Sequence, residues 1–157
     1  MPEIAVTPPL NRLCLADEKA AGTDGGTFTF GAWRTRDLNT VRNNSIAGAS
    51  LTANQFTLPA GTYFIIAQAP ALNVGLHKAK LYNITAAADV IIGQTARSGV
   101  STVLTPSIVL GVFVITSSTV FEIQHYCNTT NPDDGFGVAY SVGVVEVYTQ
   151  LIIHKLA

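Results

Sequence analysis

The three histidines are the residues best suited to acid–base or metal chemistry, and their spacing argues against both. No two of His77, His125 and His154 lie within five positions of each other, whereas metal ligands must converge. His125 alternates with Phe121 and Ile123, which favours a hydrogen-bonded histidine in the core or at a subunit interface. The alternative is a threefold axis at which one histidine from each subunit binds a metal ion or an anion.

The thiols and carboxylates form no catalytic pattern. Cys127 and His125 would lie on one strand face with the thiol buried, but a catalytic pair needs an exposed thiolate. Glu18, Glu122 and Glu146 are scattered along the chain, so no glycosidase pair can be assigned. No Gly-x-Ser-x-Gly elbow or phosphate-binding glycine loop occurs. We therefore predict no catalytic residue, cofactor or metal ligand, and a protein that is not an enzyme.

Trp33, Arg34 and Arg36 are the group best suited to binding a ligand. An aromatic ring beside basic residues can stack on a sugar or bind its carboxylates. The competing interpretation is structural: Trp33 packs at a subunit seam, and Arg36 pairs with Asp37 or Glu122. Subunit interfaces use the same residue types, and we favour this second interpretation.

The segment Asn-Pro-Asp-Asp-Gly at 131–135 loosely resembles a calcium loop. The spacing of an EF-hand and its distant glutamate are missing, and the same residues form the strongest turn signal in the chain. A solvated turn is therefore favoured over a calcium site. Asp133 and Asp134 join Trp33, Arg34 and Arg36 as candidate contacts to a partner or a glycan.

The composition points to an oligomer. Charged residues make up 12% of the 157 residues and hydrophobic residues 48%, whereas about a quarter of an ordinary domain is charged. A domain of this size has a large surface for its volume. We expect neutral polar residues to cover part of that surface and other subunits to bury another part. The net charge of −1 provides no attraction to nucleic acid or anionic lipid.

Targeting and disulfide signals are also missing. No run of about 18 apolar residues occurs, so no membrane insertion is predicted. The first nine residues lack a basic region followed by an apolar core, so no secretory signal is predicted. Two cysteines, Cys14 and Cys127, are too few for a disulfide scaffold, and free thiols are favoured in a reducing cytoplasm. The prolines among residues 1–10 favour an extended arm.

Extended segments with alternating hydrophobicity recur along the chain, and helix signals are almost absent. The last segment is long and mostly apolar, so we expect it in the middle of a sheet beside the N-terminal strand. The pattern predicts one all-β domain over residues 11–157, a sandwich, jelly roll or barrel. The expected strands are 11–17, 28–38, 50–58, 62–69, 76–83, 90–96, 101–115, 119–127 and 142–155.

Several stretches, covering roughly residues 13–155, form a distinctive order when they are taken together. They are Gly25–Thr29, Gly31–Thr40, Gln55–Tyr63, His77–Asn83, Phe121–Cys127, Asp134–Gly137 and Glu146–Thr149. The run Trp-Arg-Thr-Arg-Asp-Leu-Asn and the turn Leu-Pro-Ala-Gly-Thr-Tyr are the most specific parts. This order resembles small virion proteins of tailed bacteriophages. Their domain is similar to the trimeric jelly roll of the tumour necrosis factor and complement globular-head superfamily.

The resemblance implies a homotrimeric jelly roll of two antiparallel sheets. It implies display on the virion exterior after synthesis in the cytoplasm of the host bacterium. The partners would be other copies of the chain and capsid or tail subunits, contacted through the arm at 1–10, as a capsid decoration or a tail-associated protein. The alternative is a tail fibre or spike tip that attaches to glycans of the host cell surface.

We expect the oligomer interface on the strands that are apolar on both faces. Such strands are typical of a position buried on two sides. The residues assigned to the interface are Tyr63, Ile65, Phe121, Ile123, His125, Tyr148 and Ile152.

Overall fold

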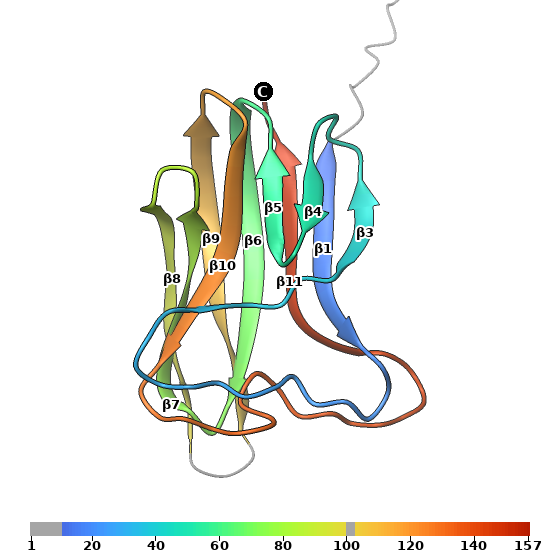
Figure 1. The fold of residues 1–157 in the computed structure, drawn as a ribbon, viewed down its shortest axis with the longest axis vertical. Helices are drawn as coiled ribbons and strands as arrows, with labels where there is room; N and C mark the ends of the chain where they lie inside the picture. The colour runs from blue at the N-terminus through green and yellow to red at the C-terminus, as the bar shows by residue number, and fades with distance from the viewer. Residues whose placement is uncertain (1–10, 100–102) are drawn as a thin grey trace, which may run out of the picture.

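The computed structural model describes residues 11–99 and 103–157, so the predicted arm at 1–10 lies outside the described residues. Eleven strands in these ranges form two antiparallel sheets that pack face to face (Figure 1). This arrangement confirms the predicted all-β sandwich. None of the described elements is a helix long and apolar enough to cross a membrane.

The two sheets are built from strands that are distant in sequence. The five-stranded sheet contains, in spatial order, β3 (Thr40–Asn44), β1 (Arg12–Lys19), β11 (Glu146–Lys155), β6 (Gly61–Leu72) and β9 (Leu104–Ile115). The second sheet contains β4 (Ser50–Thr52), β5 (Gln55–Leu58), β10 (Thr119–Cys127), β7 (Gly75–Asn83) and β8 (Ala88–Ser98), with β2 (Arg34–Thr35) beside β10. The C-terminal strand β11 lies between β1 and β6, which confirms its predicted central position.

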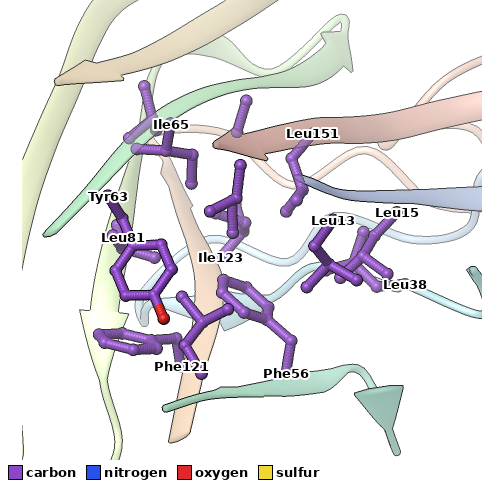
Figure 2. Close-up of a cluster of buried hydrophobic side chains, with 14 of the residues drawn as sticks. Leu13, Leu15, Leu38, Phe56, Tyr63, Ile65, Leu81, Phe121, Ile123 and Leu151 are labelled. Carbon is purple, nitrogen blue, oxygen red and sulfur yellow. The ribbon is translucent and has the colours of Figure 1, made fainter. Parts of the chain in front are cut away.

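The core lies between the sheets and is filled by alternate residues of facing strands (Figure 2). Aromatic rings from both sheets meet there. Phe113 of β9 has its centroid 5.4 Å from that of Phe121 of β10, and Phe121 stacks on Phe56 of β5 at 5.7 Å. Tyr63 stacks on Phe113 at 5.6 Å and donates its hydroxyl to the carbonyl of Pro59 at 2.7 Å. Each inward face thus buries its large apolar side chains against the other sheet.

Two expected strands are interrupted in the structure. The segment 50–58 divides into β4 and β5, because Ala53 and Asn54 adopt φ of 50° and 68° and form a tight turn. The segment 28–38 contains only β2, and the chain before it crosses one end of the sandwich (Figure 1). Strand β3 was not predicted, because its asparagines suggested a turn.

Strand β8 of the second sheet lies beside β9 of the first sheet. Ser107 of β9 accepts the backbone N–H of Ala79 at 2.8 Å and donates to the carbonyl of Gln94 at 2.6 Å. A Cβ on Gly93 would lie 2.6 Å from the carbonyl oxygen of Ala79 and 2.9 Å from that of Ile108. Backbone atoms from both sheets therefore leave no room for any side chain at position 93.

We predict that Gly93→Ala destabilises the fold by about 1–3 kcal/mol, because a rigid backbone on two sides must move to admit the methyl group. Urea denaturation of the variant and the wild type measures this change. Gly99→Ala is the control, since no described atom lies within 4 Å of a Cβ at that position. Equal stability of the two variants would contradict the close approach.

Candidate functional site

Arg36 is fully buried at one end of the sandwich and links the two sheets. Its Nε donates to Thr149 Oγ1 of β11 at 2.7 Å, and its Nη1 donates to the carbonyl of Pro70 of β6 at 2.9 Å. Nη1 also lies 3.4 Å from His125 Nδ1 of β10, and Nη2 donates to the carbonyl of Phe136 at 3.1 Å. The guanidinium stacks 4.0 Å above the Phe136 ring. Arg36 is therefore a structural residue, as the favoured interpretation held, and its burial contradicts the alternative assignment as a glycan contact.

The predicted ion pair of Arg36 is not formed within the described part of the chain. Asp37 instead binds Lys19 Nζ at 3.0 Å, and Lys19 also contacts the buried Asp17 at 3.2 Å. Glu122 accepts hydrogen bonds from neighbouring side chains, including Thr35 at 3.1 Å. Burial lowers the pKa of Arg36 to about 9, although Asp17 and Asp37 partly oppose that shift. The guanidinium thus keeps its charge at neutral pH.

The buried arginine determines the proton positions on two histidines. A guanidinium can only donate, so His125 Nδ1 must accept its hydrogen bond and carry no proton. The proton of neutral His125 is then on Nε2, 2.9 Å from His77 Nδ1. His77 therefore accepts on Nδ1 and donates from Nε2 to Thr105 Oγ1 of β9, also at 2.9 Å. We call this directed chain from Arg36 to Thr105 the arginine–histidine relay.

Both histidines of the relay are held in the neutral form. Burial, followed by the charge of Arg36, lowers the pKa of His77 to about 4. The same causes, with His77 as a further one, place the pKa of His125 well below its ordinary value. An additional proton on either ring would bring two N–H groups face to face. His125 is thus a core histidine with satisfied hydrogen bonds, as the favoured interpretation held, and its burial excludes His125 as the histidine of a threefold-axis site.

The neighbouring thiol is also unsuited to nucleophilic chemistry. Cys127 is buried and lies 3.3 Å from the carbonyl of Thr129, and burial raises the pKa of the Cys127 thiol. Cys14 and Cys127 are both free, as expected. Among residues 11–99 and 103–157, no three His, Cys, Asp or Glu side chains are grouped as ligands of a metal ion would be. The buried polar cluster therefore serves the fold.

Most of the predicted interface residues face the interior of the protomer. Tyr148 is 5% exposed, and Tyr63, Ile65, Phe121, Ile123 and His125 are fully buried. Because these side chains already pack within one chain, they cannot contact a second copy, and this part of the prediction is wrong. Only Ile152 of the predicted set is exposed. The sequence of a strand that is apolar on both faces does not reveal which face turns inward. On β6 the face with Tyr63 and Ile65 is buried, and the face with Ile66 is exposed.

The outward face of the five-stranded sheet carries a continuous apolar surface, which we call the seam face. Its residues are Ile66, Leu110, Val112, Val114 and Ile152, and their exposed fractions range from 41% to 67%. Ile152, Ile66 and Leu110 are direct neighbours across β11, β6 and β9. Strands β6 and β9 contain no charged residue. Sequence reasoning assigned only Ile152 to this surface and missed its residues on β6 and β9.

A pocket of about 450 Å³ adjoins the seam face beside β1 and β3. Its lining is more polar than the seam face. It includes Arg12, Arg42, Asn43, Gln68 and Gln150 together with Ile66 and Ile152. Arg42 is held there by Glu18, with 2.6 Å between Nε and Oε1. The apolar seam face thus has a polar border on one side.

Trp33 lies on the outward face of the second sheet, whereas Arg34 pairs with the buried His125 and therefore lies on the inward side of the same sheet. Trp33 is 38% exposed, and its ring centroid lies 5.6 Å from that of Tyr126. Arg34 is half-buried and donates from Nε to the carbonyl of Thr29 at 3.1 Å. A shallow hollow of about 280 Å³ lies beside Trp33. It is lined by Trp33, Leu76, His77, Lys78, Thr95, Tyr126 and Asn128.

The two predicted aspartates lie in the turn between β10 and β11. Asp134 Oδ1 accepts from Asn131 Nδ2 at 2.8 Å, and the backbone N–H of Asp133 donates to Thr27 Oγ1 at 3.1 Å. Asp133 has a φ of 66°, which Asp tolerates in tight turns. These bonds are those of a hydrogen-bonded turn. Neither aspartate lines the hollow beside Trp33.

We predict that acid destabilises the fold through the relay. Unfolded histidine has a pKa of about 6.5, whereas folded His77 has a pKa of about 4. Between these values the unfolded chain binds a proton that the folded chain does not. The free energy of unfolding is therefore unaffected by His77 above about pH 6.5. As the pH falls from about 6.5 toward 4, His77 lowers it by roughly 3 kcal/mol.

Urea denaturation at about pH 7 and about pH 5 tests this prediction. His77→Gln preserves an acceptor and a donor but removes the titrating ring, so its stability should fall less between the two pH values. His125, Asp17 and Glu146 also have shifted pKa values, but they are present in both proteins, so the difference between the proteins reports the contribution of His77. Identical pH dependence of the two proteins would contradict the assignment.

Comparisons with known proteins extend the description of the fold. No family model matches the chain, and no curated protein matches its sequence. The globular domain of zebrafish complement 1qA matches with a TM-score of 0.59 and 11% identity, over 94% of this chain and 98% of that one. Eiger, a tumour necrosis factor of S. frugiperda, matches with a TM-score of 0.58 and 10% identity, over 95% and 94%.

Murine APRIL matches with a TM-score of 0.55 and 10% identity, over 94% of this chain and 99% of that one. At these identities the likeness concerns the fold alone. The matches extend over nearly the whole chain and include both sheets. The chain therefore has the two-sheet jelly-roll fold of tumour necrosis factor and complement 1q globular domains, as the sequence resemblance implied.

Proposed function

We propose that this protein is a non-enzymatic homotrimer, joined through its seam face and displayed on the exterior of a bacteriophage particle. The observation that carries the proposal is the seam face itself: an uncharged, apolar surface on three adjacent strands. Burying such a surface against a partner is favourable by roughly 25 cal/mol for each Å² of apolar area that leaves water. Large apolar surfaces on a protomer therefore mark interaction sites.

A second copy of the chain is the occupant that this surface fits best. The same face carries His154, whose Nδ1 is buried and has no hydrogen-bond partner among the described residues. A group from a neighbouring copy would satisfy that atom. The polar border with Arg12 and Arg42 gives the seam the apolar centre and polar rim of protein interfaces. Threefold rather than twofold symmetry is supported by the resemblance to the trimeric jelly rolls.

The placement on a phage particle rests on the sequence resemblance alone. In that proposal the trimer decorates the capsid or is a tail-associated accessory protein, and the arm at 1–10 attaches it to capsid or tail subunits. The exterior face would be the second sheet, which lies opposite the seam face. Low charge is consistent with this role, because a trimer hides the apolar face that a monomer would have to cover with charged groups.

A second candidate function is attachment to glycans on the host cell, as a fibre or spike tip. One observation favours it: the hollow beside Trp33 and Tyr126 on the outward face of the second sheet. Partly exposed aromatic rings beside a basic residue are suited to binding a sugar. This candidate and the structural role do not exclude each other, because the two surfaces lie on opposite sheets.

We predict that Val112→Lys converts the trimer into monomers. Val112 is 58% exposed in the protomer, so the lysine is tolerated in the monomer, but in the trimer it would bury a charge without a partner. Light scattering should give about three times the 16.6 kDa chain mass for the wild type and a single chain mass for the variant. Ile92→Lys is the matched control, 53% exposed on the second sheet, and should remain trimeric.

The proposed attachment arm is tested by deleting residues 1–10. The shortened chain should remain a folded trimer, since the two sheets begin at Arg12. It should no longer be incorporated when particles are assembled in cells that supply it in place of the full chain. Quantitative mass spectrometry of purified particles measures incorporation. Normal copy numbers of the shortened chain would rule out the arm as the anchor.

A further inference from the structure

We propose that the hollow beside Trp33 binds one pyranose ring that carries an acidic substituent, a carboxylate or a phosphate. We call this hollow the aromatic hollow; its lining residues were given above. The inference deepens the glycan-binding candidate and rests on it. It requires neither the trimer nor the phage particle, because one protomer supplies every lining residue.

The base of the aromatic hollow is a row of neighbouring side chains across three strands. Tyr126 of β10 pairs with Lys78 of β7, and Lys78 pairs with Thr95 of β8. Alternate residues of a strand point to the same face, and His77 and Cys127, next to this row, are the ones that turn into the core. Trp33 lies directly before β2, which pairs with β10, so the indole stands at one end of the row.

The aromatic wall is held in a defined orientation before any ligand binds. Lys80 Nζ lies 4.0 Å from the centroid of the Trp33 ring, and Asp89 forms an ion pair with Lys80. Trp33 packs edge-on against Tyr126, which also meets the Phe30 ring edge-on with centroids 6.2 Å apart. The rings therefore support one another. A sugar ring gains affinity from such a wall because its C–H face packs against aromatic carbon.

The polar side chains of the hollow have hydrogen-bonding capacity to spare. Within the described residues, the side chains of Lys78, Thr95 and Tyr126 make no hydrogen bond. Asn128 Oδ1 accepts the backbone N–H of Leu76 at 2.9 Å, which orients its amide and leaves Nδ2 free to donate. These groups surround a volume of about 280 Å³, at the lower limit of small-molecule pockets and suited to one ring.

The charge of the hollow selects an acidic ligand. Lys80 is neutralised by Asp89, whereas Lys78 has no ion-pair partner among the described residues. No carboxylate lines the hollow. A carboxylate or phosphate on the ring would form a charge-assisted hydrogen bond with Lys78. A hexuronic acid and a phosphorylated hexose share this chemistry, so the experiment must distinguish them.

The test uses the full chain, labelled with a fluorophore, on an array of hexuronic acids, phosphorylated hexoses and neutral hexoses. Ligands that bind are then titrated in solution by calorimetry. We expect acidic pyranoses to bind, and which acidic class binds identifies the substituent. Trp33→Ala should weaken that binding about tenfold, the value of one aromatic contact. Lys78→Gln should remove the preference for acidic over neutral sugars.

Two further variants separate loss of the site from loss of the fold. Thr95→Glu places a carboxylate beside its strand neighbour Lys78 from an exposed position without removing an internal contact, and it should abolish binding of acidic sugars with unchanged thermal stability. Tyr140→Ala removes an aromatic side chain that is 81% exposed outside the hollow, and it should bind as the wild type does. Val112→Lys should also bind normally, so that failure of the trimer and failure of the site are told apart.

Three results would overturn the proposal. The first is that no pyranose binds at millimolar concentration. The second is binding of acidic sugars that Trp33→Ala and Thr95→Glu leave unchanged. The third is that neutral hexoses bind as tightly as acidic ones to the wild type, which would remove the proposed role of Lys78.

Discussion

The buried charge of Arg36 is the constraint on which one end of the sandwich depends. Removing a guanidinium from water costs several kcal/mol unless its donors find partners. Here strands β6, β10 and β11 and the carbonyl of Phe136 supply those partners. Since Arg36 only donates, His125 and His77 must both be neutral and oriented in one direction. One charge therefore sets the protonation of two histidines and connects both sheets.

The two outward faces of the sandwich have different chemistry, and this difference is the basis of the proposed functions. The seam face is apolar and free of charge on β6 and β9, which suits a second copy of the chain. The aromatic hollow combines rings, a free lysine and unpaired hydroxyls, which suits a small polar ligand. The core between them is built from residues of one chain.

Sequence patterns predicted the strands well where alternation and turns agreed. The strand predicted over 119–127 is β10, and the one predicted over 76–83 is β7 with one additional residue. The prediction failed where a turn had no sequence signal: Ala53 takes a positive φ, although alanine is not typical of that conformation. The prediction also failed for the segment 28–38, because the chain there is held by Arg36 and by the pairing of Phe28 with Asn131 rather than by a sheet ladder.

The sequence by itself determined the all-β class and the central position of the last strand, because alternation and length are local properties. Free cysteines were favoured but not determined, since pairing depends on which residues folding brings together. Only the tertiary structure decided which face of each strand is buried. Strand β6 alternates Tyr63 and Ile65 with Phe64 and Ile66, and both sets are apolar, so a period of two cannot distinguish inside from outside. The role of Arg36 was equally undetermined, since its partner Thr149 lies 113 positions away and only folding brings the two together.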